Sequence, residues 1–257
     1  MNDLVSIITP SYNTARFITE TINCVLAQTY TNWEMIIVDD CSTDDTDAVV
    51  SRFSDSRIRY LKNTKNSGAA VSRNRALQEA RGKWVAFLDS DDLWEPDKLE
   101  KQIGFMERGG YHFSYTKYVE IDDDGNSLGT VWTGPKKISK LSMYSFNYMG
   151  CLTVMYDRDY VGLIQIADLK KRNDYAMWVK IAKKCPAYLL DEVLATYRVR
   201  GTGSIMDRSK GPWSRVKYNY YLWTQGENMN PVAAMILTAV NLVFAALKKV
   251  IFKKHMQ

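Results

Sequence analysis

Apolar and polar positions alternate in regular blocks through the first hundred residues. Short apolar runs rich in β-branched side chains predict four strands, at 4–9, 33–40, 57–62 and 84–88. Segments with helical spacing lie between them and predict three helices, at 16–28, 42–53 and 67–82. Ser42 is the expected N-cap of the second helix, and Gly82 is expected to close the third. Such alternation predicts an α/β fold with a mostly parallel sheet and helices on both faces.

The pattern is less regular in the second half of the chain. It predicts two strands, an amphipathic helix and two further short strands, at 111–121, 151–157, 172–185 and within 187–199. The apolar side of this helix is formed by Ala176, Val179, Ile181 and Ala182. No repeat or low-complexity linker interrupts the region, so we expect one domain over residues 1–206 and a tail over 207–257.

The tail differs from the domain in charge and hydropathy. It carries a net charge of +6, whereas the first 206 residues sum to −1. Its uncharged run from Pro231 to Leu247 has 17 residues, which is the lower limit for crossing a bilayer, and Asn241 interrupts it. Flanking lysines and upstream aromatics favour a helix that lies in, or dips into, an anionic leaflet. The alternative is a helix packed on the protein's own core or on the second subunit of a homodimer.

Composition indicates an ordinary globular protein, with 46% hydrophobic and 25% charged residues among 257. The four cysteines have no C-x-x-C spacing, and the N-terminus has no basic segment before an apolar core. Both observations favour a cytoplasmic location. The slightly acidic domain argues against nucleic acid as a partner. Dinucleotide, P-loop and nucleophile-elbow motifs are absent, and two histidines without a cysteine cluster do not indicate zinc.

Three aspartates follow the fourth predicted strand, in the segment VAFLDSDDLWEPDKL. Carboxylates this close repel one another, so a positive group is expected among them. Asp89 and Asp91 are two residues apart in an extended segment and point the same way, which suits Mg²⁺ or Mn²⁺ with open positions for phosphates. The alternative is a set of solvated aspartates, including Asp92, that cap the helix beginning near Pro96.

The ends of the first two strands also carry polar residues. Asp39 and Asp40 could accept from the N–H of a uracil ring or orient a ribose. Thr9 supplies a hydroxyl, Pro10 is expected to stiffen a turn, and Tyr12 offers a ring that could stack on a base. The alternatives are a carboxylate that precedes the next helix and an ordinary loop.

The order VSIITPSYN…VDDCSTDDT…SGAAVSRNRALQEARGKWVAFLDSDDLWEPDKL strongly resembles family 2 glycosyltransferases with the GT-A fold. The resemblance is close from Leu4 to Leu99 and traceable to Ser204; each piece is weak alone, whereas the ordered set is specific. It implies a Rossmann-like domain with a nucleotide-sugar-binding half, residues 1–100, and an acceptor half, residues 101–206.

The resemblance implies which residues bind the donor. Arg73, which on spacing alone is either a phosphate contact or a solvated helix residue, would lie near the donor, and Arg200 would lie against its diphosphate. The donor-binding residues implied are Thr9, Pro10, Tyr12, Asp39, Asp40, Arg73, Asp89, Ser90 and Arg200.

The resemblance also implies a metal site and a catalytic base. Asp89 and Asp91 form the D-x-D pair for Mn²⁺ or Mg²⁺, with Asp92 nearby. The family's base sits in a Glu-Asp pair that opens a helix, and here the matching residues are Asn173 and Asp174. Asp174 is the candidate base; otherwise it is a carboxylate stabilised by the helix dipole.

The implied activity is inverting transfer of a sugar from a nucleotide diphosphate sugar, expected to be a UDP-sugar, to an acceptor hydroxyl. A membrane-seeking tail favours a lipid-linked saccharide of bacterial surface polysaccharide synthesis, such as O-antigen or capsule, at the cytoplasmic face of the inner membrane. The alternatives are a non-catalytic sugar-nucleotide-binding or scaffolding protein, encouraged by Asn173, and a sugar nucleotidyltransferase.

Overall fold

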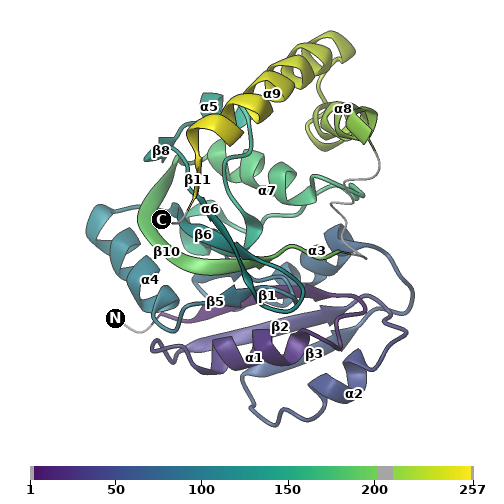
Figure 1. Cartoon of the computed structure of the whole chain (residues 1–257), viewed down its shortest axis with the longest axis vertical. Coiled ribbons are helices and arrows are strands. Elements are labelled where there is room, and N and C mark those ends of the chain that lie inside the picture. The colour runs from purple at the N-terminus through teal and green to yellow at the C-terminus, as the bar shows by residue number, and fades with distance from the viewer. Residues whose placement is uncertain (1–2, 202–210, 256–257) are drawn as a thin grey trace.

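A computed structural model, which describes residues 3–201 and 211–255, shows a mixed sheet with helices on both faces (Figure 1). At its centre β1 pairs with β4 and β2, and β2 pairs with β3, all in parallel. These strands are β1 (Val5–Ser11), β2 (Trp33–Asp39), β3 (Ile58–Lys62) and β4 (Trp84–Phe87). The four strands predicted from the apolar runs are confirmed, and their carboxyl ends meet at one edge.

The two faces of the parallel strands are covered by separate hydrophobic cores. All residues of β1 are buried, and the successive residues Ile7 and Ile8 belong to opposite cores. The core on the Ile7 side includes residues of α1 and α4, and that on the Ile8 side residues of α3 and α7. The helices of the domain are α1 (Ile18–Leu26), α2 (Thr46–Val50), α3 (Ala69–Glu79), α4 (Lys98–Gly109), α5 (Lys140–Ser145), α6 (Arg158–Val161) and α7 (Asn173–Ala182).

The second half of the chain extends the sheet with antiparallel and parallel partners. Its strands are β5 (Leu93–Trp94), β6 (Phe113–Ile121), β7 (Ser127–Trp132), β8 (Lys137–Ile138), β9 (Met155–Asp157), β10 (Ala187–Arg198) and β11 (Lys253–His255). The prediction of two short strands within 187–199 is wrong, because β10 continues through two register shifts beside β6. Asp191 and Glu192 sit at the irregularity and pair with Lys117 and Lys101 at 2.8 Å, so the acidic dipeptide interrupts the pattern without ending the strand.

Three local predictions need correction. Ser42 does not cap α2, which begins at Thr46, because the Ser42 hydroxyl donates to Asp39 instead. Gly82 does not close α3; a Cβ there would lie 2.6 Å from the Leu4 carbonyl oxygen, so glycine permits close approach to β1. The strand expected at 151–157 is split into a 3₁₀ turn, η1 (Cys151–Thr153), and β9.

The tail returns to the domain. It comprises α8 (Gly211–Tyr221), the π-helical turn η3 (Leu222–Gly226), α9 (Pro231–Ile251) and β11, which pairs with β7. Figure 1 shows α8 and α9 at the end of the molecule that also carries α5 and α7, away from α1 and α2. The boundary expected at residue 206 lies outside the described residues.

Candidate functional site at the carboxyl edge of the sheet

The loops after β1 and β2 are joined at the carboxyl edge. The backbone N–H of Asn13 donates to the Ser42 hydroxyl at 2.9 Å, and the N–H of Thr43 donates to Asn13 Oδ1 at 2.8 Å. Asn13 adopts a positive φ of 52°, which asparagine tolerates better than most residues. The two loops therefore form one unit beside the ends of β1 and β2.

Asp39 and Asp40 are both buried where β2 ends, and each is held by the surrounding chain. The Asp39 carboxylate accepts from the Ser42 hydroxyl. Asp40 accepts from the N–H of Gly68 at 2.6 Å, from the N–H of Ser67 and from Asn63 Nδ2. Asp40 thus fixes the residues that open α3 and orients its own carboxylate at the same time.

The residues of TPSYN are divided between strand β1 and the loop that follows it. Thr9 and Pro10 belong to β1 itself, so the expectation that Pro10 stiffens a turn is wrong: Pro10 pairs in register with Val38. Thr9 Oγ1 is buried and has no hydrogen-bond partner among the described residues. The Tyr12 ring, just beyond the strand, is 45% exposed and free to cover a flat ligand.

Arg73 joins two distant parts of the chain at the site. Its guanidinium donates to Asp89 Oδ1 at 2.5 Å and to Asn173 Oδ1 at 2.6 Å, which links the loop after β4 to the start of α7. Burial lowers the pKa of Arg73, but the Asp89 carboxylate outweighs this effect and the net pKa is raised. Arg73 is therefore a permanent buried cation, and Asn173 is its neutral acceptor.

Asp91 faces a second cation. Arg200 donates to Asp91 Oδ2 at 3.3 Å from the segment that follows β10. Burial, together with the charge of Asp89, raises the pKa of Asp91 to about 6, while Arg200 opposes the rise. The positive groups near Asp89 and Asp91 are thus arginines from α3 and from the end of β10.

Asp92 and Ser90 are more deeply buried than Asp89 and Asp91. Asp92 Oδ1 accepts from the backbone N–H of Arg198 at 3.0 Å. Its other oxygen, Oδ2, has no hydrogen-bond partner within residues 3–201 and 211–255. Burial, followed by the charges of Asp91 and Asp89, raises the pKa of Asp92. Asp92 is placed to hold β10 against the D-x-D loop.

The residues present fit a divalent cation that is shared between two carboxylates and the phosphates of a substrate. Within the described chain no group of three or more His, Cys, Asp or Glu side chains could enclose a metal. Asp89 and Asp91 nevertheless supply partly exposed carboxylates, with 29% and 20% of their side-chain surface accessible. Magnesium-type ions are commonly held by one or two carboxylates and completed by water and substrate phosphates. The donor set suits such a shared site.

Asp174 lies in the first turn of α7, half-buried, beside the Arg73 bridge. Asn147 Nδ2 is 3.5 Å from its Oδ2, at the limit of a hydrogen bond. The charge of Asp174 contributes to the raised pKa of Arg73 and opposes the fall in the pKa of Lys248, which burial lowers to about 8. Asp174 is thus a carboxylate among cations next to the D-x-D loop.

Arg198 and the polar cavity beside it are not among the features predicted from the sequence. Arg198 is 2% exposed, donates to the Asp91 carbonyl oxygen at 3.0 Å and pairs with Glu20 at 2.7 Å. A cavity of about 180 Å³ lies next to it, lined by Asn13, Arg16, Phe17, Asp44, Asp123 and Arg200. The signal for Arg198 was its spacing, because it precedes Arg200 by two residues at the end of a strand.

The chain belongs to glycosyl transferase family 2, whose model matches residues 6–158. TuaG of Bacillus subtilis, a glycosyltransferase provisionally assigned to teichuronic acid biosynthesis, is 41% identical over 230 residues, which cover 88% of this chain and 90% of TuaG. WfgD of Escherichia coli, a UDP-Glc:α-D-GlcNAc-diphosphoundecaprenol β-1,3-glucosyltransferase, is 43% identical over 180 residues, 70% of each chain. The protein is thus a glycosyltransferase related to enzymes of bacterial surface polysaccharide synthesis.

The fold is likewise that of known GT-A enzymes. The crystal structure of Staphylococcus aureus TarS residues 1–349 in complex with UDP-GlcNAc superposes with a TM-score of 0.72, at 21% identity, over 93% of this chain and 71% of that one. The predicted GT-A fold, with a mostly parallel sheet flanked by helices and a C-terminal helix, is confirmed.

Proposed function

We propose that the protein transfers a sugar, with inversion, from a UDP-sugar to a hydroxyl of a lipid-linked saccharide during synthesis of a bacterial surface polysaccharide such as O-antigen or capsule. The observation that carries the proposal is the Arg73 bridge, which joins Asp89 of the D-x-D loop to Asn173, the neighbour of the candidate base Asp174. The names of WfgD and of the TarS complex support a UDP-sugar donor and a lipid-linked acceptor.

The donor base would lie against β1 and β2. Tyr12 is exposed and offers its ring for stacking, and the buried Thr9 hydroxyl, which has no partner among the residues that the structure describes, could bond to the donor. Asp39, held by Ser42, and Asp40, held by the start of α3, would accept from the uracil ring or the ribose. Pro10 and Ser90 complete the walls, and Arg73 and Arg200 supply positive charge for the diphosphate.

Asp89 and Asp91 would hold a Mn²⁺ or Mg²⁺ ion together with the donor phosphates. The bound ion would neutralise charge on the departing diphosphate. Asp91 is the better candidate for a direct metal ligand, because its contact with Arg200 is long, at 3.3 Å. Asp89, by contrast, is held by Arg73 at 2.5 Å. Asp92 would stabilise this loop through its hydrogen bond from the backbone N–H of Arg198.

Asp174 would act as the general base that removes a proton from the acceptor hydroxyl. A base within reach of the attacking oxygen contributes typically 10²- to 10⁴-fold to the rate. Asn173, in the position where the family has Glu, accepts from Arg73 rather than adding a second negative charge. Asp174 is therefore the carboxylate of that pair which remains free for proton transfer.

With a lipid-linked acceptor, the proposed reaction would take place at the cytoplasmic face of the inner membrane. The test is release of nucleoside diphosphate by the purified full chain from a panel of UDP-, GDP- and dTDP-sugars, with a lipid-linked saccharide as acceptor. We expect UDP release that depends on acceptor and on Mn²⁺ or Mg²⁺ and that stops reversibly in EDTA. Turnover that is undiminished in EDTA, or no turnover with any donor, would contradict the proposal.

A non-catalytic sugar-nucleotide-binding protein is the second candidate, favoured by Asn173 alone. Binding of UDP-sugar without hydrolysis or transfer, in the same assay, would decide for it.

A further inference from the structure

The outward side of α9 is apolar at every exposed side chain that the structure describes. The exposed side chains that the structure describes on this helix are Pro231, Val232, Met235, Ile236, Ala239, Val243, Ala246, Leu247, Val250 and Ile251. They recur at helical spacing and so form one stripe along most of its 21 residues. Val250 is 82% exposed and Ile236 60%. A contiguous apolar surface of this kind marks an interaction site.

The inward side of α9 carries the polar groups. Asn241 is 1% exposed, and its Nδ2 donates to the Ser145 carbonyl oxygen at 2.9 Å and to the Tyr175 hydroxyl at 3.0 Å. Lys248 Nζ donates to the Tyr148 carbonyl oxygen at 3.1 Å. The same side also carries apolar side chains that pack on the domain core, Ala234, Leu237, Phe244 and Ala245. A surface helix in water has polar side chains on its outward side, whereas the described outward side chains of α9 are apolar. The outward side of α9 is therefore built for an apolar medium.

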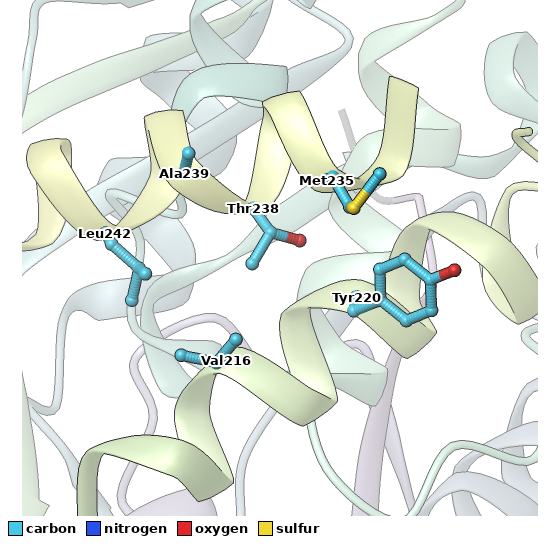
Figure 2. Close-up of a pocket in the computed structure, with 6 residues that line it drawn as sticks. All are labelled: Val216, Tyr220, Met235, Thr238, Ala239 and Leu242. Atoms are coloured by element: carbon cyan, nitrogen blue, oxygen red, sulfur yellow. The ribbon is translucent and has the colours of Figure 1, made fainter. Parts of the chain in front are cut away.

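A groove between α8 and α9 opens onto the same side. It has a volume of about 240 Å³ and is lined by Val216, Tyr220, Met235, Thr238, Ala239 and Leu242. Figure 2 shows Thr238 and Leu242 of α9 facing Val216 and Tyr220 of α8 across it. Met235 and Ala239 belong both to the groove and to the exposed stripe, so the two surfaces are continuous.

The tail that carries the stripe is basic. Arg215, Lys217 and Lys254 are exposed. The only acidic residue within 211–255 is Glu227, whose side chain is 1% exposed and pairs with Lys183. Trp213, on α8, is 80% exposed. A basic tail that combines an exposed tryptophan with an apolar stripe matches the charge and polarity profile of an anionic bilayer surface.

We propose that the stripe of α9 and the adjoining groove bind an anionic lipid bilayer, with the axis of α9 lying in the plane of the interface rather than across the membrane. Asn241 and Lys248 tie the helix to the domain, and β11 returns the chain to β7. The proposal rests on the proposed function in one respect: a membrane bound at this surface would carry the lipid-linked acceptor that the proposed reaction uses.

A second copy of the chain is a poorer occupant of the stripe. A twofold contact would bring the basic residues of both copies together, with no exposed acid within residues 211–255 to balance them. The stripe also lacks hydrogen-bonding side chains that would fix a protein partner's register, which a fluid lipid surface does not require.

Vesicle flotation of the full chain tests the proposal without donor or acceptor, so its outcome is independent of the transfer reaction. We expect the protein to float with phosphatidylglycerol–phosphatidylethanolamine vesicles, less with phosphatidylcholine vesicles, and less at high salt. The double substitution Ile236→Glu and Val243→Glu should reduce the bound fraction at least tenfold. The matched control, Leu163→Glu with Val193→Glu, introduces the same charge at exposed apolar positions elsewhere and should float as the wild type does.

Two results would overturn this proposal. One is a wild-type protein that does not float with anionic vesicles. This result would include a protein that sediments as a dimer and becomes a monomer when Ile236→Glu and Val243→Glu are introduced. The other is a charged variant that floats normally.

The orientation is tested with spin labels at Val232→Cys, Val243→Cys and Val250→Cys, made in a Cys41→Ser background because Cys41 is exposed. An in-plane helix places the three labels at the same depth. A depth that changes steadily from residue 232 to residue 250 would show a spanning helix and contradict the proposal.

Discussion

The parallel strands and α9 follow opposite patterns of burial. In β1, β2 and β4 the apolar side chains are buried on both faces, and acidic residues gather where β2 and β4 end. In α9 the buried residues include Asn241 and Thr238, and the exposed side chains that the structure describes are apolar. Both regions are hydrophobic in sequence, so hydropathy alone does not distinguish them.

This difference in burial indicates which kind of partner suits each region. Acidic residues at a strand edge, balanced by Arg73 and Arg200, suit a charged ligand with a cation in water. An apolar stripe on a helix held by inward hydrogen bonds suits a lipid surface. The predictions below test each side of this contrast, beginning with the largest effect.

Asp91→Ala should reduce sugar transfer by about 10⁴-fold, because stabilisation of the departing diphosphate by a bound cation contributes several kcal/mol. Thermal unfolding should be nearly unchanged, since Asp91 is partly exposed and is not a core residue. Asp159→Ala, an exposed carboxylate on α6, is the matched control. Steady-state kinetics with saturating donor measure the loss; activity within tenfold of wild type would remove Asp91 from the site.

Asp174→Asn should reduce kcat by about 10³-fold, the range expected for loss of a general base. The affinity for UDP-sugar should change little, because the proposed role concerns the acceptor proton. Calorimetric titration of donor, beside the kinetic assay, separates the two effects. A variant with weakened donor affinity and unchanged kcat would assign Asp174 to donor binding instead.

Lys98, on α4, is a fully buried cation beside the parallel strands. Burial lowers its pKa from 10.5 to about 7. The unfolded chain therefore binds more protons than the folded chain between about pH 7 and pH 10.5, so this group makes stability rise with pH across that window. Lys98→Met should stabilise the protein more at pH 7 than at pH 9, by about 2 kcal/mol. Urea unfolding at both pH values measures this; an equal effect would show that Lys98 stays charged when buried.

Asn241→Ala should lower the free energy of unfolding by about 1–3 kcal/mol, because it leaves buried acceptors on α5 and α7 without their donor. Ala246→Ser, on the exposed stripe, is the control and should be close to neutral. Chemical denaturation measures both. An effect of Asn241→Ala no larger than that of the control would mean that α9 is not held by this residue.

The strands and the acidic edge could be predicted from the sequence because their signals are local. An apolar run predicts β4, and the aspartates follow it directly. The prediction for 187–199 was wrong because it also used local signals alone. The polar pair Asp191–Glu192 is typical of a turn, but pairing with β6 keeps β10 continuous through it.

The partners of the acidic residues could not be predicted in this way. The positive group expected among Asp89 and Asp91 was a metal ion, and the structure adds Arg73 and Arg200, the second more than a hundred residues away in sequence. Asn241 was read as an interruption of an apolar helix, whereas its amide binds carbonyls of α5. Such pairings arise only when the chain folds back on itself.

Calorimetric titration of UDP into the purified protein, in manganese chloride and in EDTA, is the most direct test of the carboxyl-edge site. We expect binding in manganese that weakens at least tenfold in EDTA and equally in Asp91→Ala. Equal affinity with and without the metal, or no binding of UDP at all, would contradict the account.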